Sequence, residues 1–280
     1  MIKFSVVTAT YNAAKTLRQA LDSVLSQNYP AVEYIIIDGG STDGTVDILR
    51  EYSTHLAYWV SEADTGIYEA FNKGIQAATG DYLYFLGADD CLCDKDILFK
   101  VAENLDDSID ILSAGVYVVR SDWNLEKIID NEHARDINCF DGEMIPHQGM
   151  FTKTNILKER HFDTSFQLAG DYDFFMECYF DEKIKFRFVD FPVAYYATGG
   201  AGSSAGELNL RERRRIWTKY HIDYLLKKTE KWNFQPSRIR IAVKACITLL
   251  GLYPCLLRLF QGWRPHHCNN RICRWCGREG

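Results

Sequence analysis

The chain has 280 residues, of which 47% are hydrophobic and 25% charged, an ordinary globular composition that suffices for one large domain or two small ones. The net charge of −6 is unevenly distributed. Residues 1–206 hold 16 Lys and Arg against 33 Asp and Glu, whereas residues 207–280 hold 16 against 5. The acidic body argues against nucleic-acid binding, and the basic C-terminal part is a candidate for contact with anionic lipid headgroups.

The start of the chain has no signal-peptide pattern, because residues 1–3 lead straight into an apolar strand without a basic stretch or a cleavage site. We therefore expect a cytoplasmic protein. The nine cysteines are an odd number, which argues against a full disulfide framework, and we expect reduced thiols.

The first 90 residues alternate between predicted strands and helices. Apolar runs predict strands at residues 4–8, 33–38, 55–60 and 81–86. Apolar residues at helical spacing predict helices at 15–26, from 45 to 52 and at 67–78. We expect Thr42 or Asp43 to cap the second helix and Gly80 to cap the third. This alternation predicts a parallel sheet with right-handed crossovers.

Beyond residue 90 the pattern changes to longer strands and aromatic-rich helices. We expect helices at residues 94–105, 171–180, 207–228 and 239–260. We expect a hairpin of strands at 109–120 and 123–130, and further strands at 149–152 and 186–196, the last interrupted by Pro192. Four glycines among residues 198–206 predict a mobile loop.

Acidic residues stand where predicted strands end. Asp38 closes the second strand, and Asp89 and Asp90 follow the fourth. Open α/β sheets bind ligands beyond the carboxyl ends of their strands, and carboxylates suit Mg²⁺ or Mn²⁺ with substrate phosphates completing the shell. The pattern predicts a site for a divalent metal and a phosphorylated ligand. The alternative is a solvated turn with Asp94 as a helix cap.

Four sequence blocks resemble the family 2 glycosyltransferases with the GT-A fold. They are residues 5–12 (SVVTATYN), 36–45 (IIDGGSTDGT), 66–74 (GIYEAFNKG) and 80–90 (GDYLYFLGADD). The blocks occur in the family's order and spacing, and the resemblance covers about residues 3–200. It implies an α/β fold with a Rossmann-like, mostly parallel central sheet flanked by helices. It also implies a nucleotide-sugar donor, a divalent metal and inversion at the anomeric carbon.

The resemblance implies roles for individual residues. On the donor side it implies that Thr8, Ala9 and Tyr11 border the nucleoside pocket, that Asp38 lies near the base or ribose, and that Asp64, Asn72 and Asp89 lie near the nucleotide. Asp89 and Asp90 match the family's DxD-type metal motif, and His147 and Gln148 match a pair that lines the acceptor or diphosphate side.

Two glycines depart from the family pattern. Gly87 stands at the first position of the metal motif, where many members carry Asp or Asn, so we expect the metal to depend on Asp89 and Asp90. Gly39 stands where some relatives have a second Asp that contacts uracil. This leaves UDP, GDP and dTDP donors open.

Displacement of a nucleoside diphosphate by a sugar hydroxyl needs a base for the hydroxyl proton. Asp171 is our candidate, because it follows Gly170 at the start of a predicted helix and can project into a cleft. The resemblance agrees, since many relatives place an Asp base at this helix start, although Gly170 replaces a common Glu. Asp173 is the rival base, and helix capping by Asp171 is the structural alternative.

The predicted domains are a catalytic domain, residues 1–206, and a basic helical extension, residues 207–280. Residues 1–90 form the nucleotide-binding half of the catalytic domain and 91–206 the acceptor half. Within the extension, residues 241–257 suit an interfacial helix better than a spanning one, and the alternative is a core helix. The last cysteines and histidines, His266, His267, Cys268, Cys273 and Cys276, could furnish four zinc ligands, and the alternative is a disordered basic tail.

The sequence thus predicts a metal-dependent, inverting glycosyltransferase of the hexosyl or N-acetylhexosaminyl type. The expected acceptor is a glycan or lipid-linked glycan of polysaccharide or cell-envelope biosynthesis, with peripheral contact at the inner face of the cytoplasmic membrane. One alternative is a sugar nucleotidyltransferase, although residues 8–12 lack the Gly-rich basic loop that it would need. The other is a non-catalytic glycan-binding protein on the same fold.

Overall fold

The computed structural model describes residues 1–120, 125–131, 134–135, 145–198 and 206–222, and three two-residue strands, Arg264–Pro265 (β10), Ile272–Cys273 (β11) and Arg278–Glu279 (β12). Three predictions fall wholly or mostly outside this part of the chain. They are the helix at 239–260, the glycine-rich loop at 198–206 and the zinc site, of which only the Cys273 backbone is described.

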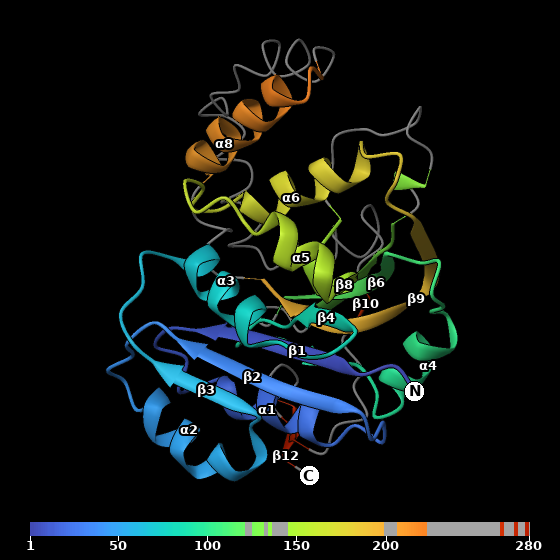
Figure 1. The fold of residues 1–280 in the computed structure, drawn as a ribbon. Coiled ribbons are helices and arrows are strands. Elements are labelled where there is room, and N and C mark those ends of the chain that lie inside the picture. The colour runs from blue at the N-terminus through green and yellow to red at the C-terminus, as the bar shows by residue number, and fades with distance from the viewer. Residues whose placement is uncertain are drawn as a thin grey trace.

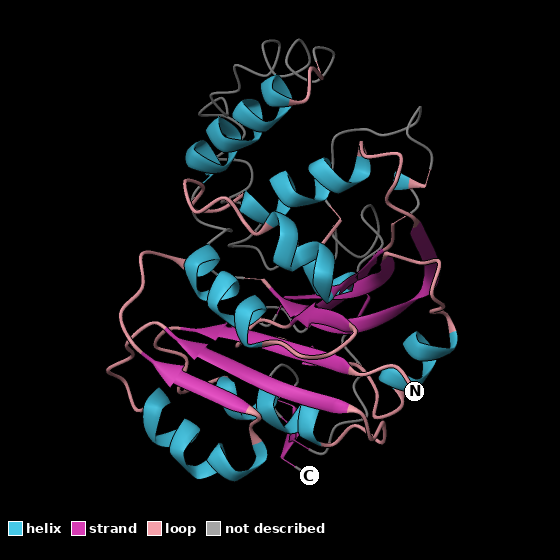
Figure 2. Ribbon diagram, viewed as in Figure 1, coloured by secondary structure: helices cyan, strands magenta, loops and turns pink. Residues whose placement is uncertain are grey.

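The fold is a mixed sheet with helices on both faces (Figures 1 and 2). Its main strands are β1 (Phe4–Thr10), β2 (Val32–Asp38), β3 (Tyr58–Ser61), β4 (Tyr82–Phe85), β5 (Cys91–Leu92), β6 (Ile111–Arg120), β7 (Leu125–Ile129), β8 (Met150–Lys153) and β9 (Phe186–Ala197). The main path runs β10-β7-β6-β8-β4-β1-β2-β3, and β9 pairs with β5 and β6.

The first half of the sheet is parallel, as the alternation of strands and helices predicts. β4, β1, β2 and β3 run in one direction, whereas β8 is antiparallel to both β4 and β6. The predicted hairpin is confirmed by the antiparallel pair β6–β7. Pro192 lies in β9 at a register shift against β6, where Gly115 faces it. The expected α/β fold class is confirmed.

The helices are α1 (Leu17–Leu25), α2 (Thr45–Tyr52), α3 (Ile67–Ala77), α4 (Ile97–Glu103), α5 (Thr154–Arg160), α6 (Gly170–Tyr179) and α8 (Gly206–Lys219). Two short 3-10 turns are η1 (Ser53–His55) and η4 (His147–Gly149). The third strand therefore begins at Tyr58, three residues later than predicted, because residues 53–55 form η1. The helix predicted at 207–228 ends at Lys219, and a turn follows in which His221 has a positive φ of 56°. Helix α5 was not predicted.

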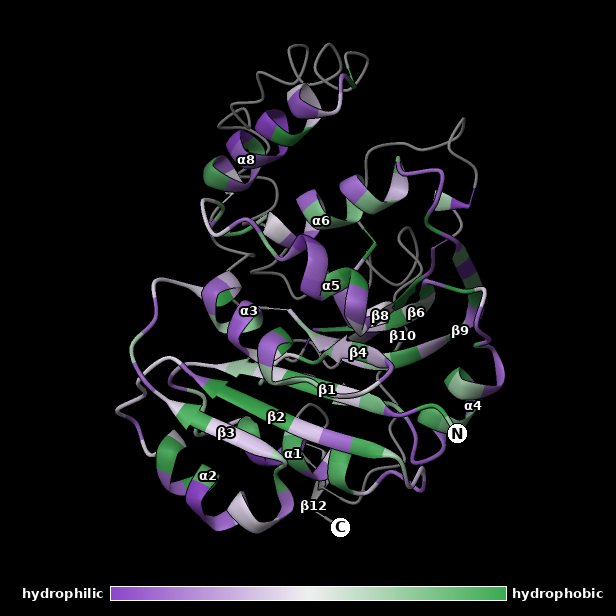
Figure 3. Cartoon of the chain, in the orientation of Figure 1, coloured by the Kyte–Doolittle hydropathy of each residue, from purple (hydrophilic) through white to green (hydrophobic). Residues whose placement is uncertain are grey.

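Both faces of the central strands are buried, each against its own helices. Val7, Leu83 and Phe85 pack into one apolar cluster with α3, α5, α6 and α8. Val6 and Tyr84 point the other way, into a second cluster with α1, α2 and α4. Burial on both faces explains why these strands are continuous apolar runs. In Figure 3 the strands β1 and β2 are largely green, whereas α8 carries much purple.

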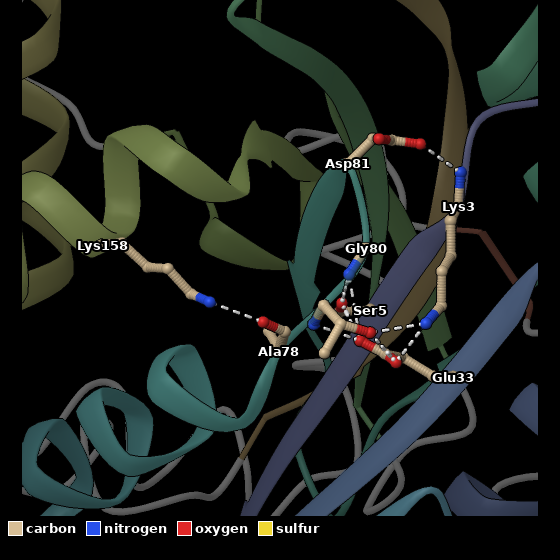
Figure 4. Close-up of polar contacts among 8 residues, drawn as sticks. Lys3, Ser5, Glu33, Ala78, Gly80, Asp81 and Lys158 are labelled. Carbon is tan, nitrogen blue, oxygen red and sulfur yellow. Dashed lines mark hydrogen bonds and ion pairs between the residues drawn. The ribbon is translucent and has the colours of Figure 1, made fainter.

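A polar network ties together the amino-terminal ends of β1, β2 and β4 (Figure 4). The carboxylate of Glu33 accepts hydrogen bonds from Lys3 Nζ, Ser5 Oγ and Thr79, at 2.5 to 2.6 Å. Burial raises the pKa of Glu33, but these donors outweigh it and lower the pKa to about 2. The network therefore contributes stability to the sheet as long as Glu33 is charged.

The two expected helix caps are wrong. Helix α2 begins after Gly44, which has a φ of 99°, while Asp43 accepts a hydrogen bond from the Thr45 amide without being the cap. Helix α3 ends at Ala77, before Gly80. Gly80 instead lies against β1, where a Cβ would stand 2.7 Å from the Ser5 nitrogen. A glycine is needed at position 80 because the backbone of β1 comes close to it, and not because it caps a helix.

None of the helices in the described part of the chain has the length and apolar content of a membrane span. Helix α8, which begins the predicted extension, packs on the helices that cover one face of the sheet. Its Ile216 and Trp217 belong to the same apolar cluster as α3 and α6.

Candidate active site

A pocket of about 510 Å³ lies beyond the carboxyl ends of β1 and β4. It collects Ala9 after β1, Asp89 and Asp90 after β4, His147 and Gln148 from η4, and Asp171 from the first turn of α6. The rest of its wall includes Ile67, Tyr68, Phe71, Gly87, Gln167, Leu168, Tyr196 and Asn209. Six of the predicted site residues therefore share one pocket, although they come from four distant parts of the sequence.

Asp90 is a buried carboxylate in the wall of this pocket. Its side chain accepts hydrogen bonds from Gln148 Nε2 at 3.1 Å and from the Ala197 amide at 3.0 Å. Burial, and then the neighbouring charge of Asp89, raise the pKa of Asp90 from 3.8 to about 7. The protein thus holds two adjacent carboxylates at a cost that a bound cation would relieve.

Gly87 makes room for the Asp90 carboxylate. A Cβ at position 87 would lie 2.4 Å from Asp90 Oδ2 and 3.1 Å from Asp89 Oδ1. Because Gln148 and the Ala197 amide hold Asp90 in this place, a side chain at position 87 would push it away from them. The glycine that departs from the family pattern is therefore matched to the position of the two remaining carboxylates.

Asp171 is held by three donors. Its Oδ1 accepts from the Tyr68 hydroxyl at 3.0 Å and from the Tyr172 amide at 2.9 Å. Its Oδ2 lies 2.8 Å from His147 Nδ1. Gly170 precedes it, and a Cβ there would meet the Tyr68 ring at 2.9 Å. The Tyr68 ring thus fills the space that a side chain at position 170 would need.

Asp173, the rival base, is engaged elsewhere. Both oxygens of its buried carboxylate lie within 2.9 Å of Lys219 Nζ from α8. Asp173 is also not among the residues that line the pocket. Of the two acidic residues in the first turn of α6, Asp171 is the one that faces the pocket.

Tyr196, near the end of β9, lines the same pocket as the acidic groups. Burial raises its pKa, and the charges of Asp90, Asp89 and Asp171 raise it further. Tyr196, Tyr68 and Asn209 were not predicted as site residues. Tyr196 and Asn209 lie in none of the four sequence blocks, and Tyr68 lies in the block 66–74 without a role assigned to it, so their places in the site depend on long-range packing.

Asp38 lies at the end of β2 and is fully buried. It accepts hydrogen bonds from the amides of Gly40 and Ser41 and from the hydroxyls of Ser41 and Ser61. These bonds shape the loop after β2. A Cβ at Gly39 would lie 2.8 Å from Asp64 Oδ2, so Asp64 occupies the space that a second acidic side chain would need. Burial raises the pKa of Asp64.

The other predicted donor-side residues are not among those that line the pocket. Thr8 is fully buried and its hydroxyl bonds the Leu86 carbonyl at 2.8 Å, so it fixes β1 against the segment after β4. The amide of Asn72 pairs with the backbone N–H and C=O of Phe162, both at 2.9 Å. Tyr11 is 67% exposed beyond the end of β1.

The donor set at Asp89 and Asp90 suits a hard divalent cation. Mg²⁺ and Mn²⁺ often take only one or two protein carboxylates, with phosphate oxygens and water as the remaining ligands. Within the described residues there is no cluster of three or more His, Cys, Asp or Glu side chains that could hold a metal ion. The raised pKa of the buried Asp90 is the observation that fits a cation to this pair.

Two solved structures share this fold. The structure of TarS residues 1–349 from S. aureus in complex with UDP matches with a TM-score of 0.59 and 24% identity, over 71% of this chain and 61% of that one. The mannosyltransferase PcManGT from Pyrobaculum calidifontis, in complex with GDP-Man and Mn2+, matches with a TM-score of 0.63 and 20% identity, over 93% and 81%. These likenesses concern the fold.

The chain belongs to glycosyl transferase family 2, whose model matches residues 5–176. It is 27% identical over 251 residues to a PGL/p-HBAD biosynthesis glycosyltransferase of Mycobacterium tuberculosis, covering 85% of this chain and 94% of the relative. It is 31% identical over 183 residues to an uncharacterized glycosyltransferase of the same species, covering 61% and 67%. The expected family and enzyme class are confirmed, which argues against a sugar nucleotidyltransferase.

Proposed function

We propose that the protein transfers a single sugar, with inversion, from a nucleotide-sugar donor to a glycan or lipid-linked glycan. The observation that carries this proposal is the content of the pocket. It combines the acidic pair Asp89 and Asp90 with a separate carboxylate, Asp171, that hydrogen bonds from Tyr68 and His147 hold at the start of α6. A displacement at a sugar carbon needs these two functions, one for the leaving diphosphate and one for the incoming hydroxyl.

The charges in the pocket support a requirement for a metal. Three carboxylates line it, and no Lys or Arg stands among the described residues of its wall. A nucleoside diphosphate would be repelled there without a cation. Asp89 and Asp90 would hold Mg²⁺ or Mn²⁺, and the ion would neutralise the charge on the departing diphosphate.

Asp171 is the proposed general base. Its Oδ1 already accepts two hydrogen bonds, whereas Oδ2 has His147 Nδ1 as its partner among the described residues and keeps a lone pair for the acceptor hydroxyl. His147 thereby orients the base, and Gln148 orients Asp90 on the diphosphate side. Tyr68 fixes the far side of the Asp171 carboxylate.

The donor is proposed to be a hexose or N-acetylhexosamine linked to a nucleoside diphosphate. TarS has been solved with UDP-GlcNAc and PcManGT with GDP-Man, which supports this class of donor. The nucleoside would lie toward Ala9, Tyr11 and the loop that Asp38 and Asp64 shape, with Thr8 and Asn72 supporting that side from within the fold.

A lipid-linked acceptor agrees with the basic character of residues 207–280. We place the protein in the cytoplasm, with its C-terminal extension in peripheral contact with the inner face of the membrane. The division into a catalytic domain, residues 1–206, and this extension belongs to the same proposal.

The direct test is hydrolysis of UDP-GlcNAc, UDP-glucose and GDP-mannose, with water as the acceptor. We expect turnover of one donor with Mn²⁺ and none with EDTA. Asp171→Asn should lower that turnover at least ~10²-fold, because a general base contributes about this much, while donor affinity stays unchanged. Asp47→Asn, on the exposed surface of α2, is the matched control. Near-normal turnover by Asp171→Asn would dismiss Asp171 as the base.

A further inference from the structure

Helix α8 contributes a buried carboxylate to the segment that leads into the proposed base. Glu212 is only 7% exposed. Its oxygens accept hydrogen bonds from the backbone amides of Gln167 at 2.8 Å and of Leu168 and Ala169 at 2.9 Å each. These three amides directly precede α6, whose second residue is Asp171. A buried charged side chain with three backbone donors is well satisfied, and its loss would leave those donors without partners.

Helix α8 also contacts α6 at residues that follow Asp171 in the sequence. Trp217 Nε1 donates to the Tyr172 hydroxyl at 2.9 Å, and Lys219 pairs with Asp173. In Figure 1 α8 lies alongside the start of α6. Helix α8 therefore holds the chain immediately before and immediately after Asp171.

The chain at Gly170 is tightly packed on the side that faces the pocket. Gly170 packs so closely on Tyr68 that a Cβ would meet its ring at 2.9 Å, and Tyr68 itself donates to Asp171. Gln167 and Leu168 line the pocket. A shift of residues 167–169 would therefore move both Asp171 and the part of the pocket wall that these residues form.

We propose that Glu212 is a positioning residue for sugar transfer: by binding the amides of residues 167–169 it sets where the Asp171 carboxylate stands. This inference rests on the proposed function of Asp171. Glu212 is not among the residues that line the pocket, so its loss should leave donor binding intact and reduce the chemical step. Misplacement of a reacting group by about 1 Å can cost on the order of 10²-fold in rate.

The test compares Glu212→Gln with Glu207→Gln, a matched change at an exposed position on the first turn of α8. The Gln variant keeps the size of Glu212 but replaces one accepting oxygen with a donor. Donor hydrolysis is measured with Mn²⁺ at a temperature well below the melting temperature. Calorimetry counts the donor-binding sites in each sample, and the rate is divided by that number. We expect Glu212→Gln to lower kcat at least about tenfold with donor KM unchanged, and Glu207→Gln to match the wild type.

A second readout needs no turnover. The ring nitrogen Nδ1 of His147 bonds Asp171, so its ¹⁵N chemical shift reports where that carboxylate stands. We expect Glu212→Gln to move this resonance in the metal-free protein and Glu207→Gln to leave it in place. If the wild type hydrolyses none of the donors, the proposed function fails, and this spectrum still decides the role of Glu212.

An unchanged His147 resonance and an unchanged kcat per binding site in Glu212→Gln would overturn the proposal, whatever the loss of stability. If Glu212→Gln does not fold, Glu212→Asp replaces it, because it keeps the charge and withdraws the oxygens by one methylene, about 1.5 Å. If both variants fail to fold, Glu212 is a purely structural residue and the proposal falls.

Discussion

The buried acidic residue of the metal pair should destabilise the protein when no cation is present, so Asp90→Asn should stabilise it. The pKa of Asp90 is raised by burial and by Asp89 from 3.8 to about 7. A carboxyl that holds its proton more tightly in the folded state makes folding less favourable as pH rises through this range. Each pKa unit is worth about 1.4 kcal/mol, so the cost above pH 7 is about 4 kcal/mol.

Asparagine removes this cost but also weakens the hydrogen bonds from Gln148 and the Ala197 amide, which we set at about 2 kcal/mol together. We therefore expect Asp90→Asn to be more stable than the wild type by about 2 kcal/mol at about pH 8 with EDTA. The advantage should disappear at about pH 5, where the falling cost of the charged carboxyl equals the weakened hydrogen bonds, and turn into a deficit of up to about 2 kcal/mol below about pH 3.8, where the wild-type carboxyl is mostly neutral in both states. Urea unfolding at each pH measures the difference.

Asp38→Asn is the control, because Asp38 is equally buried but accepts four hydrogen bonds from its own loop and from Ser61. That variant should lose stability. If Asp90→Asn is less stable than the wild type at pH 8, or if its gain does not change with pH, the cost assigned to the acidic pair is wrong.

Three further predictions concern other parts of the molecule. Gly87→Ala should displace Asp90 from Gln148 and weaken the gain in donor affinity that Mn²⁺ gives by at least about tenfold, and calorimetry with an unchanged gain would contradict this. Glu33→Gln should lower the free energy of unfolding by about 2 kcal/mol at neutral pH after allowance for solvent screening, since donors hold the pKa of Glu33 at about 2. This difference should vanish between about pH 4.5 and about pH 2, where the wild type loses the same stabilisation. Urea unfolding in acid that still shows the variant less stable would refute the prediction. Deletion of residues 236–280 should abolish flotation with vesicles of anionic lipid while leaving donor hydrolysis, and equal flotation of both proteins would exclude the anchor.

The parallel half of the fold was predictable because its signals are local. Each of β1, β2 and β4 is a run of apolar residues buried on both faces, and each ends where polar or acidic residues begin. Helix α5 was missed for a local reason too. It has seven residues, starts directly after β8 without a turn, and carries charged residues over its second half.

The pocket was predictable from strand ends and family motifs, whereas the residues that orient it were not. Tyr68 reaches Asp171 across 103 residues of sequence, and Glu212 reaches the Ala169 amide across 43. Within the run of arginines at 211–215, Glu212 looks like one more solvated charge. Its burial follows from how α8 packs on the core, which no local pattern encodes.

We expect the donor diphosphate to bind only with a divalent cation at Asp89 and Asp90. Isothermal titration of UDP and GDP into the wild-type protein, with Mn²⁺ and with EDTA, tests it most directly, and Asp89→Ala supplies the comparison. We predict tight binding of one nucleotide with Mn²⁺, and weak binding with EDTA or in Asp89→Ala. Equal affinity with and without the metal in the wild type would contradict the account.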